Sequence, residues 1–174
     1  MNSTRVVFPA PNLVELEDVD LDESGLGRHE VVVRTHRTLI SPGTELARLR
    51  GKLMFDSDVP PEFPMSTVGY ANVGTVLGAG EETGVAPGDR VYTMGNHATV
   101  VRGDVRRMLC VPVPDGLADE EAVFARLATV SMTTLVTTFA RPGDQVAVVG
   151  LGLVGNLAAQ VFQASGMRVN AFDL

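Results

Sequence analysis

The chain has 174 residues, of which 45% are hydrophobic and 20% charged, a composition typical of a folded globular protein and not of a disordered one. Its formal net charge of -7 gives no general attraction for phosphate backbones or anionic membranes, and it has no tryptophan and few other rings to stack on bases. A single cysteine, Cys110, excludes an internal disulfide. The N-terminus lacks a secretory signal and no segment has the roughly 20 apolar residues that span a bilayer. We therefore expect a cytoplasmic protein that binds neither nucleic acid nor membrane.

Short β-prone segments separated by turn residues fill the N-terminal part of the chain, which predicts a small barrel or sandwich. The separators are clusters of the type GLG, SPG, GAG and PGD. One short helix is expected after Ser41-Pro42, closed by Gly51, and residues 52–65 form a proline-rich loop expected to be irregular. The β-prone segments are residues 5–8, 13–19, 30–40, 69–77, 90–93, 97–102 and 108–113.

The composition changes after Pro114-Asp115-Gly116, where acidic residues 119–121 precede an apolar stretch and favour the positive end of a helix. We expect a connecting helix over 119–140, between a first domain of residues 1–118 and an incomplete second domain of residues 141–174. Within the second, residues 145–150 and 168–172 have the composition of buried parallel strands and residues 153–165 that of a helix. This order is one βαβ unit.

A glycine motif, G-x-G-x-x-G, lies between the first of these strands and the helix, and each of its glycines has a physical task. Gly150 permits the tight turn, Gly152 lets a pyrophosphate approach the backbone, and Gly155 allows the helix to pack closely on the strand. The N–H groups at the helix start, at Leu153 and Val154, supply a local site for an anion. The alternative, a chance glycine-rich turn, is weakened by the strand and helix on either side.

Asp173 follows the second strand at the spacing expected of an acid that accepts hydrogen bonds from the adenosine ribose and repels a 2′-phosphate. It favours NAD(H) over NADP(H) as cofactor. The structural alternative is a helix cap or a solvated strand end.

The order of motifs resembles the medium-chain dehydrogenase/reductase family over essentially the whole chain. The resemblance implies a mainly β, partly open GroES-like barrel followed by the first βαβ unit of a Rossmann domain, and oxidoreductase activity with a nicotinamide cofactor. The variant Ser-Pro-Gly-Thr-Glu is similar to a subgroup that includes bacteriochlorophyllide dehydrogenase-like oxidoreductases. The blocks that carry the resemblance are residues 40–46 (ISPGTEL), 63–64 (FP) with 68–76 (VGYANVGTV), 87–91 (PGDRV), 113–117 (VPDGL), 120–122 (EEA), 141–144 (RPGD) and 146–155 (VAVVGLGLVG).

The zinc ligands of the metal-dependent members of that family have no counterparts in this sequence. The corresponding positions hold Ser41 or Pro42, Tyr70-Ala71 and Leu127-Ala128, none of which reproduces a site of three Cys, His or carboxylate ligands. One cysteine also excludes the structural zinc lobe, which needs four. No zinc is expected.

Without a metal, hydride transfer needs a substrate carbonyl or alkene polarised by hydrogen bonds, together with a proton relay. Thr44, Ser41 and Tyr70 are the hydroxyls that the resemblance places near the active site. Thr44 is the preferred candidate, and an N-cap of the following helix is its structural alternative. For Tyr70 we favour a packing role.

Four further residues have two interpretations each. Glu45 either orients a catalytic group or is a solvated charge on a short helix. His36 and His97 are either proton relays or, as we favour, structural or exposed side chains. Cys110 is expected to be a buried, inert thiol and not a nucleophile.

These residues support an oxidoreductase that acts without zinc on a carbonyl or activated alkene of a small organic substrate. A noncatalytic binding or assembly module is the alternative, and redox-neutral chemistry on the same scaffold is a third. Because the second domain is predicted to be incomplete, we expect little or no activity from these residues alone. We also expect a homo-oligomer, or pairing through the exposed edge of the βαβ fragment.

Overall fold

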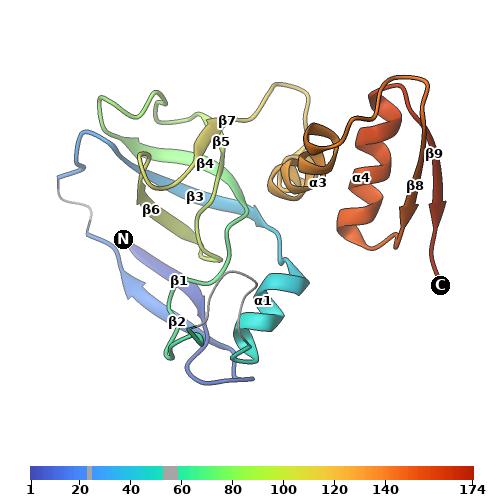
Figure 1. The fold of residues 1–174 in the computed structure, drawn as a ribbon. Coiled ribbons are helices and arrows are strands. Elements are labelled where there is room, and N and C mark those ends of the chain that lie inside the picture. Colours follow the sequence, from blue (N-terminus) through green and yellow to red (C-terminus); the bar gives the residue numbers. More distant parts are fainter. Residues whose placement is uncertain (23–24, 53–58) are drawn as a thin grey trace. The chain divides into compact units, whose positions relative to one another are not determined.

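The computed structural model describes residues 1–22, 25–52 and 59–174. The chain divides into two compact units, Met1–Val123 and Phe124–Leu174. Figure 1 traces the order of helices and strands along the chain. The division falls a few residues after residue 118, where the sequence predicts a domain boundary. None of the helices in the described ranges has the length and apolar character that crossing a bilayer requires.

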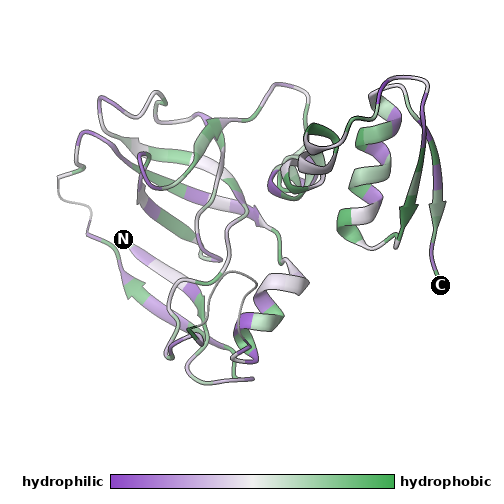
Figure 2. Cartoon of the chain, viewed as in Figure 1, coloured by the Kyte–Doolittle hydropathy of each residue, from purple (hydrophilic) through white to green (hydrophobic). Residues whose placement is uncertain are grey.

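A five-stranded antiparallel sheet forms the centre of the first unit. Its core contains alternating residues of one strand, Val31 and Val33, packed with Val76 and Val91 of two other strands, and all four side chains are buried. Figure 2 shows hydrophobic and hydrophilic residues in bands along the strands. In the order β6-β3-β4-β5-β7, the strands are Val100–Asp104, Glu30–Thr38, Asn72–Ala79, Arg90–Thr93 and Cys110–Pro112.

Strand β3 contains two register shifts against β4, between Val32 and Val33 and between Thr35 and Arg37. The second shift leaves His36 without a paired residue on β4, as an extra residue in a bulge does. The ring of His36 contacts Asp119 through Nδ1 at 2.8 Å and Thr75 through Nε2 at 3.0 Å. It is therefore a partly exposed structural side chain.

A second sheet of the first unit pairs β1 (Asn2–Val7) with β2 (Glu15–Asp20). It is joined to the chain beside β6 by a bridge between Arg5 and Ala98, and by the buried Ser3 hydroxyl, which donates to the Val100 carbonyl at 2.8 Å. Within the described residues neither sheet closes on itself. The GroES-like barrel therefore remains a prediction, whereas the sheet-dominated architecture is observed.

The first unit also contains helices α1 (Pro42–Leu49) and α2 (Asp119–Ala122). Helix α1 begins after Ser41 with a proline, which suits the first turn because its missing N–H needs no partner there. Gly51 follows α1 with a φ of 65°, the left-handed conformation expected of it. Part of the proline-rich loop predicted for residues 52–65, residues 53–58, lies outside the described residues.

The single connecting helix expected over 119–140 is instead two helices, α2 and α3 (Ala125–Thr137). Val123 and Phe124 form a turn between them. Helix α3 ends before Pro142, which lacks the backbone N–H that a continuing helix requires.

The second unit contains the strands β8 (Gln145–Val149) and β9 (Arg168–Phe172), which pair in parallel and are connected by helix α4 (Leu153–Ala164). Val148, Phe162 and Met167 form its buried centre. The strand–helix–strand order is the one that the sequence predicts.

Candidate functional site

The glycine loop connects β8 to α4 and has a backbone that requires glycine at two positions. Gly150 has a φ of 90°, a left-handed conformation that side chains disfavour. A Cβ atom on Gly155 would lie 1.9 Å from the Gly150 carbonyl oxygen. By contrast, a Cβ atom on Gly152 would meet nothing within 4 Å. The structure therefore explains Gly150 and Gly155 by the loop itself, and leaves space for a ligand at Gly152.

Helix α4 starts directly from this loop, with Gly152 as its N-cap residue and Leu153 and Val154 in its first turn. No side chain caps this helix start. Uncapped N–H groups and the helix dipole favour an anion at such a position. Of the predicted cofactor-binding residues, Gly152, Leu153 and Val154 thus lie together at one helix start.

Asp173 lies at the end of β9 and is bonded to the glycine loop. Its Oδ2 atom accepts a hydrogen bond from the Leu151 N–H at 2.6 Å, and Oδ1 accepts one from the Leu174 N–H at 2.7 Å. The bond from Leu151, and then the one from Leu174, hold the pKa of the Asp173 carboxyl below its usual range. Asp173 therefore fixes the loop, a role that the sequence analysis did not consider.

Ser131 of α3 is a buried polar residue in the second unit that sequence reasoning missed. Its hydroxyl lies 2.9 Å from the Val154 carbonyl oxygen and 3.1 Å from that of Leu127. It connects α3 to the first turn of α4. A lone serine in an apolar helix carries no sequence signal for such a contact.

The three candidate catalytic hydroxyls belong to the first unit and are not joined to one another by any hydrogen bond among the described residues. Ser41 is buried and is the N-cap residue of α1. Thr44 is partly buried inside α1, so its alternative role as the N-cap is wrong. Tyr70 is also partly buried, and its carbonyl accepts a hydrogen bond from the Tyr92 hydroxyl at 3.3 Å.

A buried pair of ionisable side chains lies beside Ser41. Glu45 on α1 and His97, before β6, are only 4% and 5% exposed. Glu45 Oε2 lies 2.7 Å from His97 Nε2, while Oε1 accepts a hydrogen bond from the Ser41 N–H at 2.6 Å. The Thr38 hydroxyl at the end of β3 contacts His97 Nδ1 on the other side of the ring. Glu45 had two interpretations, an orienting residue or a solvated charge. Its burial shows that the solvated charge is wrong.

Gly69 leaves the space that the His97 ring occupies. Its φ is 98°, and a Cβ atom there would lie 2.7 Å from the ring. The loop before β4 is therefore shaped around His97. Sequence reasoning named Glu45 and His97 separately, but their pairing across 52 residues has no local pattern.

The Glu45–His97 pair lies in the wall of a cavity of about 310 Å³. Glu45 and His97 are the ionisable groups among the described residues that line it, and the remaining lining is almost entirely apolar. The apolar lining residues are Val6, Phe8, Val14, Ile40, Leu46, Leu49 and Val68.

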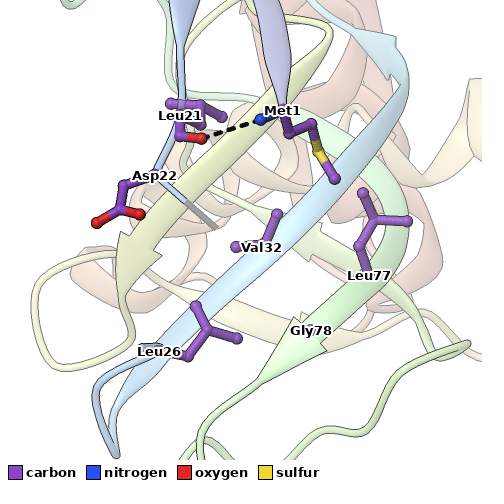
Figure 3. A pocket seen from close by; sticks show the side chains of 7 residues that line it. All are labelled: Met1, Leu21, Asp22, Leu26, Val32, Leu77 and Gly78. Atoms are coloured by element: carbon purple, nitrogen blue, oxygen red, sulfur yellow. Dashed lines mark hydrogen bonds between the residues drawn. The ribbon is translucent and has the colours of Figure 1, made fainter. Parts of the chain in front are cut away.

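A second cavity, of about 220 Å³, lies between the β1–β2 sheet and the five-stranded sheet (Figure 3). Its described side chains are mostly aliphatic, among them Leu26, Val32 and Leu77. The Met1 ammonium donates a hydrogen bond to the Leu21 carbonyl at its rim, at 3.1 Å. The cavity brings together no pair of catalytic side chains.

The described residues contain no group of three or more His, Cys, Asp or Glu side chains placed to hold a metal ion. Cys110, at the start of β7, is half-buried, and burial raises the pKa of its thiol. A raised pKa disfavours the thiolate, in line with the expected inert thiol.

Comparison with known proteins finds no matching family model but several relatives. The chain is 28% identical over 185 residues to 2-desacetyl-2-hydroxyethyl bacteriochlorophyllide A dehydrogenase of Cereibacter sphaeroides, covering 95% of this chain and 54% of the relative. It is also 28% identical over 184 residues to D-guloside 3-dehydrogenase of Escherichia coli, covering 95% and 52%. The chain thus spans about half the length of the curated relatives it matches.

Solved structures share the fold. Alcohol dehydrogenase TADH from Thermus sp. ATN1 superposes with a TM-score of 0.79 at 24% identity, over 97% of this chain and 57% of that one. Mycobacterial Rv1454c, whose structure is a complex with NADPH, gives a TM-score of 0.71 at 22% identity, over 97% and 51%.

These relatives and structural neighbours are members of the medium-chain dehydrogenase/reductase family, which confirms the resemblance seen in the motifs of this chain. It corresponds to the N-terminal portion of the alcohol dehydrogenase-like fold.

Proposed function

We propose that the chain is the N-terminal part of a zinc-independent NAD(P)-dependent oxidoreductase that transfers hydride to or from a carbonyl or activated alkene of a small organic substrate. The glycine loop carries this proposal. Its close packing at Gly155 and its open space at Gly152 are the two features that a bound pyrophosphate requires. The named relatives are dehydrogenases, and no observation favours a noncatalytic module.

In this proposal, Gly152, Leu153 and Val154 hold the pyrophosphate through their backbone at the start of α4. The bound cofactor supplies or accepts the hydride. Asp173 keeps the loop in place and, as a carboxylate, favours NAD(H) over a cofactor with a 2′-phosphate. The first unit supplies the substrate site, where Ser41, Thr44 and Tyr70 are the candidate hydroxyls and no zinc takes part.

The test is a calorimetric titration of the 174-residue chain with NADH and with NADPH, beside a Gly152→Ala variant. The added methyl enters open space, so the fold is retained while the pyrophosphate is obstructed. We expect NADH to bind more tightly than NADPH, and the variant to lose at least about tenfold in affinity, or about 1.4 kcal/mol. A folded chain that binds neither nucleotide contradicts the proposal, and equal binding by the variant contradicts the assigned site.

A further inference from the structure

Among the buried polar side chains of the described residues, Glu45 and His97 are the ionisable ones, and cofactor binding leaves them unused. Two ionisable side chains are rarely withdrawn from water without hydrogen bonds that compensate for the loss of hydration. The hydrogen-bond partners of this pair are as follows. Glu45 Oε1 accepts the Ser41 N–H, and Glu45 Oε2 faces His97 Nε2. Beyond the ring, the Thr38 hydroxyl lies within hydrogen-bonding distance of His97 Nδ1 and, at 2.8 Å, of the Ala71 carbonyl oxygen.

The position of the single Thr38 proton divides these contacts into two states. If Thr38 donates to Ala71, it accepts from His97 Nδ1–H, and one further proton lies between His97 Nε2 and Glu45. The pair is then neutral overall. If Thr38 donates to an unprotonated Nδ1, the Nε2–H donates to the Glu45 carboxylate, and the pair carries one negative charge.

The two states differ by one proton and by the rotation of one hydroxyl. No buried group loses its last partner in either state, because the Ala71 carbonyl also accepts the Leu39 N–H at 3.0 Å. The Ser41 N–H remains bonded to Glu45 in both. Glu45 and His97 are buried, whereas Thr38 is an exposed residue at the edge of the network. A network that satisfies its hydrogen bonds in two protonation states can exchange a proton without rearranging the fold.

The cavity beside the pair limits what can exchange that proton. Its volume of about 310 Å³ is at the lower end of the range for small-molecule sites. Phe8, Leu49 and Val68 are among the apolar residues that surround the pair in the cavity wall. A compact, mainly apolar molecule with one oxygen matches this lining, since a second polar group would lack a partner.

We propose that Glu45, His97 and Thr38 are the proton-exchange group of this oxidoreductase, and that the adjoining cavity binds a compact apolar alcohol or the corresponding ketone. This inference rests on the proposed function. In oxidation, the alcohol O–H bond breaks and its proton passes to the anionic pair. The carbinol C–H bond breaks, its hydride goes to the oxidised nicotinamide cofactor, and the C=O bond forms. Reduction reverses each of these transfers.

The experiment is solution NMR of the 174-residue chain with ¹⁵N-labelled histidine, using cyclohexanol, cyclohexanone and methylcyclohexane as probes. Cyclohexanone can only accept hydrogen bonds, so it favours the protonated state of the pair, whereas cyclohexanol can also donate one, which favours the anionic state. We expect the two probes to shift the His97 ring nitrogens in opposite directions and methylcyclohexane to leave them unchanged. His97→Gln assigns the signals, and His36→Gln is the matched control at an exposed histidine.

Two variants separate proton exchange from a merely structural pair. Glu45→Gln keeps the shape and both hydrogen bonds but removes the carboxylate, and should weaken cyclohexanol binding about tenfold. Thr38→Val removes the rotating hydroxyl and should abolish the opposite responses. Backbone spectra establish that each variant is folded.

Shifts in one direction for both oxygenated probes, or no shift in a folded chain, overturn the inference. Parallel titrations with NADH and NADPH test the proposed function independently of this inference. If NADH binds and His97 does not respond, the inference alone fails. If His97 responds as expected and neither nicotinamide cofactor binds, the ligand site is supported and the oxidoreductase proposal is contradicted.

Discussion

The two units of the chain build their candidate sites from different materials. In the first unit the site is made of side chains, Glu45 and His97, that are almost completely withdrawn from solvent. In the second it is made of backbone, at a glycine loop in which Gly155 lies so close to the Gly150 carbonyl that no Cβ atom fits between them. A site of buried side chains depends on hydrogen bonds between residues that are distant in the sequence. A backbone site depends on a few adjacent glycines that have no side chain. The two should therefore fail in different ways when mutated.

The largest effect is expected from removing one member of the buried pair. His97→Leu leaves the Glu45 carboxyl without its partner in an apolar cavity, and should lower the free energy of unfolding of the first unit by about 3–5 kcal/mol. Denaturant unfolding followed by hydrogen exchange of the β3 and β6 amides measures this. Glu45→Gln is the control, because its amide still bonds to His97. A loss below about 1 kcal/mol for His97→Leu, within the range of exposed pairs, would show that the pair is not buried in solution.

The next effect is expected in the glycine loop, where Gly155→Ala forces a methyl against the Gly150 carbonyl. The backbone must shift, which should destabilise the second unit by about 1–3 kcal/mol. Gly152→Ala is the matched control, since its methyl has space, and it should change stability by no more than about 1 kcal/mol. Equal destabilisation by the two variants in thermal unfolding would contradict the division between a packing glycine and a ligand-facing one.

A smaller effect is expected at Ser131, the one buried side-chain contact from α3 to the α4 start described above. Ser131→Ala removes the one hydroxyl proton that the Leu127 and Val154 carbonyls share, and should cost about 1 kcal/mol. Hydrogen exchange of the α4 amides should report it. Thr129→Ala, which removes an exposed bond from Thr129 to the Ala125 carbonyl, is the control and should leave exchange in α4 unchanged.

The smallest effect is expected at Asp173 and depends on pH. Because hydrogen bonds from Leu151 and Leu174 lower its pKa in the folded chain, Asp173 stabilises the loop above the usual aspartate value of 3.8, and this contribution is lost as the pH falls through the lower folded value. The Leu151 amide should therefore lose protection in acid. Asp173→Asn should show the same protection at all pH values in this range. An identical acid response in both proteins would assign it to another group.

The contrast between the units also explains what could be predicted from the sequence. The glycine loop occupies consecutive residues, so its turn, its packing and its helix start were predictable from a local pattern. Even there, the bond from Leu151 to Asp173 was missed, because it depends on how β8 and β9 pair. Strand positions were predictable from alternation, but the break between α2 and α3 was not, since Val123 and Phe124 are not residues that typically form turns.

The buried pair could not be predicted because no local pattern marks it. Thr38 and His97 are 59 residues apart, and Glu45 and His97 are 52 apart. Each residue alone has an ordinary explanation as a strand end, a helix charge or a strand start. Only the tertiary fold brings them to one cavity.

The bulge at His36 determines on which face of β3 the residues after it lie. A one-residue change of phase moves every following side chain to the opposite face of a strand, so the extra residue sets the direction of Thr38. Deleting any one residue between Val33 and Thr38 would turn the Thr38 hydroxyl away from His97, even if every remaining residue kept its identity. In this strand, the number of residues is therefore more strongly constrained than their chemical nature. Homologous chains should differ here by substitution and not by insertion or deletion.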